Sequence, residues 1–110
     1  LKFKGEVIGF FDVVGPDGGQ LKVKLDDGEE KIVPRFDAYC VYHRLSKFQA
    51  GADLAKDAVH TVSVTLDSAG PDKRTVLFEK NRPDFDKNPE KFAPKIWNVG
   101  AVMLIGEVVE

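Results

Sequence analysis

The sequence predicts a mainly β fold, a small closed or partly open Greek-key β-barrel that carries one helix. Apolar and polar residues alternate with a period of two in several segments, which is typical of strands that bury one face. Turn-forming residues separate these segments. We expect six strands and one helix in 110 residues, and an open flat sheet of that size would leave bare edges. Closing the sheet into a barrel removes those edges.

The first three strands are expected at residues 1–14, 21–26 and 30–36. Two glycines interrupt the first strand, which is typical of a bulge or a bend. The second strand alternates most cleanly and places Lys22 and Lys24 on its polar face. The pair Asp27-Gly28 then supplies the positive-φ residue of a tight hairpin. Because Pro34 cannot donate to a ladder, the third strand should lie at an edge or end there.

A helix is expected between Asp37 and Gly51. Asp37 can cap its start, and Gly51 can end it. The apolar residues between them follow at spacings of three, four and three, as one stripe on a helix does: Ala38, Val41, Leu45 and Phe48. Alternate residues from 39 to 45 are also apolar or aromatic, so a strand is the alternative in this segment.

Three further strands complete the expected order, at residues 59–66, 74–80 and 100–109. The last of them is apolar on both faces, which indicates a central position in the sheet or a cover on both sides. A long connection with three prolines runs from Asn81 to Asn98. Connections of this length are often functional.

The composition limits the classes of function. A mass of 12.2 kDa, with 43% hydrophobic and 31% charged residues, indicates one folded domain over residues 1–110. The net charge of -2 excludes a strongly basic chromatin-type protein, so any nucleic-acid site has to be a local patch. The single Cys40 excludes an internal disulfide framework and a Cys-rich zinc site. No apolar stretch is long enough to span a membrane.

The chain starts at Leu1 rather than at Met, so we expect a segment cut from a longer protein or a processed product. A signal peptide removed earlier would leave no trace in it. We expect an intracellular location, cytoplasmic or nuclear.

The C-terminal third is similar in layout to a known family. Residues 73–78 (Lys-Arg-Thr-Val-Leu-Phe) precede a proline-containing loop and residues 99–105 (Val-Gly-Ala-Val-Met-Leu-Ile). This layout resembles oligonucleotide/oligosaccharide-binding (OB) fold domains that bind single-stranded DNA, of the replication protein A and telomere end-binding kind. Residues 3–9 are also similar to a first strand of such a barrel. The family usually has Asp where this chain has Ala101, followed by a strand that contains Arg.

The resemblance implies three strands, a helix that plugs the barrel, two further strands, and binding of single-stranded DNA or RNA. Such binding needs cations for phosphates and exposed aromatic faces for bases. Residues 35–47 hold three basic residues against one acidic, and residues 73–95 hold seven against four. The candidate nucleic-acid-binding residues are Lys22, Lys24, Arg35, Tyr39, Tyr42, Arg44, Arg74, Lys80, Arg82, Phe85 and Trp97.

Each of these residues also has a purely structural interpretation. Lysines that alternate with apolar residues are most often a solvated strand face. Three phenylalanines are expected in the core rather than as stacking platforms: Phe36, Phe78 and Phe92. Phe85 and Trp97 are expected to be more exposed, because they lie in the proline-rich connection.

The sequence contains no catalytic motif, and we expect neither an enzyme nor a bound cofactor or metal. Cys40 and His43 could share a metal, but two ligands do not make a zinc site. No third group is evident that would orient them as a nucleophilic pair. The glycine-rich residues 15–19 lack the Lys-Ser/Thr that a phosphate-binding loop needs.

Two hypotheses of different classes follow. The first is a barrel that binds single-stranded nucleic acid. The second is a protein-interaction or assembly module, with a homo-oligomer or another protein as partner, which pairs through an edge strand or a long loop. Salt separates them, because phosphate contacts weaken steeply as salt rises and an apolar interface does not.

Overall fold

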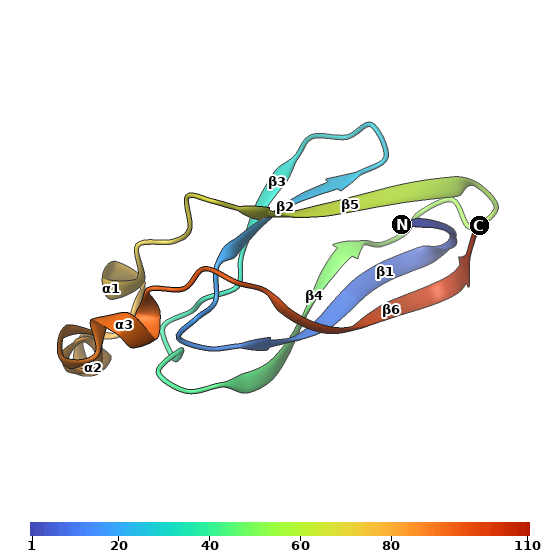
Figure 1. Ribbon diagram of the computed structural model, residues 1–110. Helices are drawn as coiled ribbons and strands as arrows, with labels where there is room; N and C mark the ends of the chain where they lie inside the picture. Colours follow the sequence, from blue (N-terminus) through green and yellow to red (C-terminus); the bar gives the residue numbers. More distant parts are fainter.

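The computed structural model describes residues 1–110 and shows a mainly β domain. Its strands are β1 (Lys2–Val14), β2 (Gln20–Leu25), β3 (Lys31–Pro34), β4 (Arg44–Gly51), β5 (Val59–Asp67) and β6 (Asn98–Val108). Its helical elements are α1 (Lys73–Val76), the 3-10 turn η1 (Glu79–Asn81), α2 (Arg82–Lys87) and α3 (Pro89–Phe92). The helices gather at one end of the molecule, and both termini lie at the other end (Figure 1).

The long strand β1 organises the sheet. The antiparallel order is β3-β2-β5-β1-β4, and β6 pairs with β1. Residues 2–4 of β1 pair with β5, whereas residues 8–14 pair with β4. The strands therefore lie in two groups, β2-β3-β5 over β1-β4-β6 (Figure 1). The sheet is not closed, because β3, β4 and β6 each keep an unpaired edge, so the structure does not confirm a barrel.

Two apolar clusters hold the domain together. The larger lies between the two groups of strands and consists of Phe3, Ile8, Phe10, Leu21, Val23 and Val62. The smaller joins the end of β1 to the helical segment and consists of Val14, Phe36, Cys40, Leu77 and Phe92. The alternation in β1 and β2 thus has the origin that the sequence indicates, since alternate side chains enter the core.

The local signals of the first strands are confirmed. The register of β1 shifts next to Gly5 and Gly9, which confirms the glycine-marked irregularities. The third strand is an edge strand that ends at Pro34, as predicted. The hairpin between β2 and β3 is also confirmed, but its positive-φ residue is Asp26 (φ 52°) rather than Gly28.

The helix predicted over residues 37–51 is wrong, because residues 44–51 form β4. In β4 the side chains of Phe48 and Ala50 pack against the core, whereas Leu45 is 85% exposed. The second half of β1 needs a hydrogen-bonded neighbour on this edge, and β4 supplies it. Pairing with β1 therefore overrides the helical spacing. The alternative of a strand over residues 39–45 is also wrong for most of its length, because the strand begins only at Arg44.

The strand predicted over residues 74–80 is also wrong. Residues 73–76 form α1, which begins at Asp72, whose carboxylate accepts a hydrogen bond from the backbone N–H of Thr75. All helices of the domain therefore lie between β5 and β6, and no helix lies between β3 and β4, where the OB resemblance requires one. The last strand is not central, because β6 pairs with β1 alone.

Candidate functional site

The outer surfaces of the two groups of strands differ in chemistry. On the β2-β3-β5 group, Lys22 lies opposite Thr65 and Lys24 lies opposite Ser63. The apolar exceptions on this surface are Ile32 and Pro34 of β3, which lie opposite Lys22 and Gln20. The surface is what the alternation in β2 predicts, a solvated strand face.

The outer surface of the β1-β4-β6 group is apolar. We call it the apolar face, and the strand register places on it Val7, Phe11, Val13, Leu45, Lys47, Gln49, Ala101, Met103 and Ile105. Phe11 is 43% exposed, Leu45 85% and Ile105 61%. Lys47 is the single charged side chain of this set, and the same register places polar Asn98 at one end of the face and charged Lys4 and Glu107 at the other. This face was not identified from the sequence, because it depends on which strands become neighbours.

A second candidate surface is an exposed aromatic pair. The rings of Tyr39 and Phe78 meet edge to face, with centroids 4.8 Å apart, and they are 53% and 42% exposed. The Arg44 guanidinium lies 5.8 Å from the Tyr39 ring, and the Lys80 ammonium lies 6.0 Å from the Phe78 ring. We call these four residues the aromatic–cation cluster. Phe78, which was expected in the core, is therefore exposed.

Backbone contacts fix the cluster. The backbone N–H of Phe78 and the side-chain amide of Asn81 both donate to the carbonyl oxygen of Ala38. Arg44 forms an ion pair with Asp37. Burial is the largest single influence on the pKa of the Asp37 carboxyl and raises it, but the charge of Arg44 and the hydrogen bonds from Arg44, the Tyr39 backbone and Cys40 together outweigh burial and lower that pKa. The structure thus brings together Tyr39, Arg44 and Lys80 from two distant segments, as the nucleic-acid hypothesis needs.

Two other predicted site residues take structural roles. Arg35 donates from Nε and Nη2 to the buried carboxylate of Asp12. The indole N–H of Trp97 donates to the same carboxylate, and its ring packs beside Phe10. Trp97 is therefore less exposed than its place in a proline-rich connection indicates.

The remaining predicted residues are spread over several surfaces. Arg74 pairs with Asp86, and Arg82 donates to the carbonyl oxygens of Arg74 and Thr75. Phe85 packs against Phe92. Tyr42 is exposed, and Lys22 and Lys24 lie on the outer surface of β2. The structure therefore does not gather the predicted residues into one groove.

Lys73 has a role that periodicity does not reveal. Its ammonium is buried and donates to the carbonyl oxygens of Pro16, Phe92 and Pro94 at 2.6, 2.8 and 2.7 Å. Burial lowers the pKa of Lys73 to about 8. These contacts tie the helical segment to the turn between β1 and β2.

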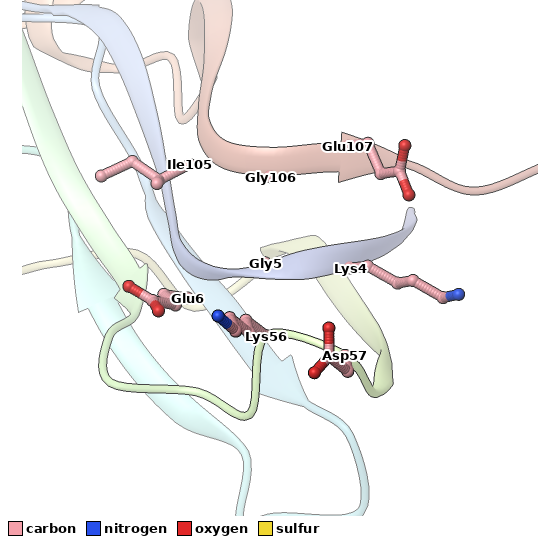
Figure 2. Close-up of a pocket in the computed structure, with 8 residues that line it drawn as sticks. All are labelled: Lys4, Gly5, Glu6, Lys56, Asp57, Ile105, Gly106 and Glu107. Carbon is pink, nitrogen blue, oxygen red and sulfur yellow. The ribbon is translucent and has the colours of Figure 1, made fainter.

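An open pocket of about 570 Å³ lies where β1 and β6 meet the turn before β5 (Figure 2). Its lining residues are Lys4, Gly5, Glu6, Lys56, Asp57, Ile105, Gly106 and Glu107. Figure 2 shows that its charged side chains are spread along the pocket rather than aimed at one point. No ion pair joins them, and both signs of charge are present, so the pocket does not select one ligand chemistry.

The structure does not assemble a reactive centre around Cys40. The thiol is buried, and burial raises its pKa, which disfavours the nucleophilic thiolate. His43 bonds to Asp17 instead of facing Cys40. No three metal-ligating side chains come together, and none of the helices has the length and apolar character to cross a membrane.

No protein-family model, no curated protein and no solved structure matches this chain. Its function is therefore inferred from its own geometry and chemistry.

Proposed function

We propose that this domain is a non-catalytic protein-interaction module that docks onto an apolar protein surface through its apolar face. The observation that carries the proposal is the contrast between the two outer surfaces. One presents Lys22, Lys24, Ser63 and Thr65 to solvent, whereas the other presents mostly aliphatic and aromatic side chains.

An exposed apolar surface of this kind is unfavourable in water unless something covers it. Contiguous apolar patches beyond a few hundred Å² are rare on monomers and mark interaction sites. Covering such a surface contributes roughly 25 cal/mol for each Å² of apolar area removed from water. Because Lys47 is the single charge in the central part of the face, with Lys4 and Glu107 only at its end, the matching partner surface is apolar and carries few charges.

The direct test asks whether the apolar face is open to an apolar probe. The probe is the dye 8-anilinonaphthalene-1-sulfonate, together with retention on a phenyl resin. We expect the wild-type chain to enhance dye emission and to be retained, and the Leu45→Asp/Ile105→Asp variant to lose both. The matched control, Ser63→Asp/Thr65→Asp, should behave as the wild type, because it changes the polar surface. A wild-type chain that neither binds the dye nor is retained would contradict the proposal.

A second candidate function is binding of single-stranded nucleic acid at the aromatic–cation cluster. It is favoured by the two half-exposed rings and by Lys80, whose ammonium has no ion-pair partner. Stacking of a base on such a ring contributes roughly 1–3 kcal/mol. The resemblance to OB-fold domains and their closed barrel stays a hypothesis within this second candidate.

Titration of fluorescent oligo(dT) at two salt concentrations tests the second candidate. Binding that weakens with salt and is lost in Tyr39→Ala/Lys80→Ala supports it. Absence of binding at low salt and low micromolar protein rejects it.

A further inference from the structure

We propose that this chain pairs with a second copy of itself, with the two β6 strands antiparallel along their free edges. This inference rests on the proposed interaction module, because the second copy enlarges the apolar face and leaves it open to the partner of that module. The paired strands would continue the β1-β4-β6 group of one copy into that of the other, so the apolar faces of both copies would become one surface.

The free edge of β6 lacks the features that protect the other edges of the sheet. β3 is only four residues long and contains Lys31 and Pro34. β4 carries Arg44 and Lys47. Short length, charge and proline are the ways in which proteins keep edge strands from pairing. β6 is eleven residues long and contains no proline, and its one charged residue, Glu107, stands next to its end.

The regular part of β6 is centred on Met103. Between the irregularities near Gly100 and Gly106, residues 101–105 pair with residues 7–11 of β1 without interruption. An unbroken stretch presents backbone N–H and C=O groups of every second residue along the free edge, which an antiparallel strand can use for ladder hydrogen bonds.

A two-fold axis at Met103 makes this stretch complementary to itself. It places Ala101 opposite Ile105 of the second copy, and Val102 opposite Leu104. Residues 98–106 contain no charge, so no like charges oppose each other. Glu107 would lie opposite Val99 of the second copy, and within its own chain it already lies opposite Lys4. An isologous contact of this kind closes as a dimer and does not propagate into a fibre.

The test places like charges, and then opposite charges, at the positions that face each other across the two-fold axis. One variant is Ala101→Lys/Ile105→Lys, and the other is Ala101→Glu/Ile105→Glu. Both side chains are exposed and point away from the core in the single chain, so the fold should survive, which circular dichroism verifies. Ser63→Glu/Thr65→Glu on the polar surface is the matched control, because the new carboxylates lie opposite Lys24 and Lys22.

Sedimentation velocity over roughly 1–300 µM protein is the measurement. The wild type and the control should form a dimer whose fraction rises with concentration and does not fall with salt. Each charged β6 variant alone should sediment as a monomer, because lysine would face lysine and glutamate would face glutamate. An equimolar mixture of the two variants should restore the dimer, because lysine then faces glutamate.

The outcomes separate this inference from the function on which it rests. A wild type that binds the apolar dye and stays monomeric at every concentration overturns the second copy as partner but leaves the interaction module standing. A wild type that neither binds the apolar dye nor forms a dimer overturns both the interaction module and the β6 pairing. A dimer that survives in both charged variants, or a mixture that stays monomeric, overturns the β6 pairing.

Discussion

Arg35 forms a bidentate ion pair with Asp12, in which Nε and Nη2 each lie 2.7 Å from a different carboxylate oxygen. The Asp12 side chain is fully enclosed and that of Arg35 is 11% exposed. The indole N–H of Trp97 donates to the same carboxylate at 2.9 Å, and Arg35 also donates to the hydroxyl of Ser46. One buried network therefore joins β1, β4 and the segments that follow β3 and precede β6.

Loss of either partner of this ion pair should be strongly destabilising. Asp12→Asn or Arg35→Gln should lower the free energy of unfolding by about 3–5 kcal/mol, because a buried charge loses its counter-charge. Urea unfolding followed by the emission of Trp97 measures the change. Arg74→Gln is the control, since its pair with Asp86 is exposed and should contribute little. Equal losses in Arg35→Gln and Arg74→Gln would show that the buried network is not a main source of stability.

Lys73→Met should loosen the helical segment. The substitution keeps an apolar stem of similar length but leaves the carbonyl oxygens of Pro16, Phe92 and Pro94 without their shared donor. A buried group left unpaired costs about 1–3 kcal/mol. Hydrogen exchange should rise mainly in residues 73–95 and much less in β1 and β2. Uniform exchange across the whole chain would mean that Lys73 does not act locally.

Stability should fall as pH rises past neutrality because of His60. Its Nδ1 lies 2.8 Å from a carboxylate oxygen of Asp26 and its Nε2 lies 2.8 Å from the carbonyl oxygen of Ala55. Both neighbours can only accept, so these two contacts favour the imidazolium form of the ring. The hydrogen bond to Asp26, followed by that to Ala55, raises the pKa of His60 above its ordinary value of 6.5.

Because the pKa is higher in the folded state, this contribution is complete below pH 6.5 and is lost as pH rises through the folded-state pKa. Urea midpoints from about pH 5 to pH 9 measure it. His60→Gln should flatten this part of the profile. An unchanged profile in His60→Gln would remove His60 as its cause.

Gly106 should not tolerate a side chain. Its φ is 149°, and an added Cβ would lie 2.0 Å from the backbone oxygen of Lys4. Gly106→Ala should therefore lower the free energy of unfolding by about 1–3 kcal/mol. Gly100→Ala is a control in the same strand, because its nearest neighbour, the backbone oxygen of Phe11, lies 3.6 Å from the added Cβ. Thermal unfolding of the two variants should rank them in this order, and the reverse order would contradict the close approach of β1 and β6.

The candidate surfaces were only partly predictable. The predicted residues Tyr39, Arg44 and Lys80 do converge, since basic and aromatic residues were concentrated in the two segments that meet at Ala38. Arg35 and Trp97 were also predicted to bind nucleic acid. In the structure, the buried carboxylate of Asp12 accepts hydrogen bonds from both side chains. The sequence shows that a side chain can donate hydrogen bonds, but it does not show which group in the folded protein accepts them.

Local alternation predicted β2, β5 and the first part of β1 correctly, because a strand with one buried face shows period-two patterning, and an apolar segment bounded by glycines predicted β6. The turn residues likewise determine the hairpin after β2 and the end of β3. Tertiary contacts decide the rest. Residues 44–51 become a strand because β1 needs a hydrogen-bonded neighbour there. Lys73 lies in a helix rather than in a strand, and its ammonium donates to three carbonyl oxygens of other segments. The apolar face exists only once β1, β4 and β6 lie side by side, since no single strand records which neighbours its exposed side chains will have.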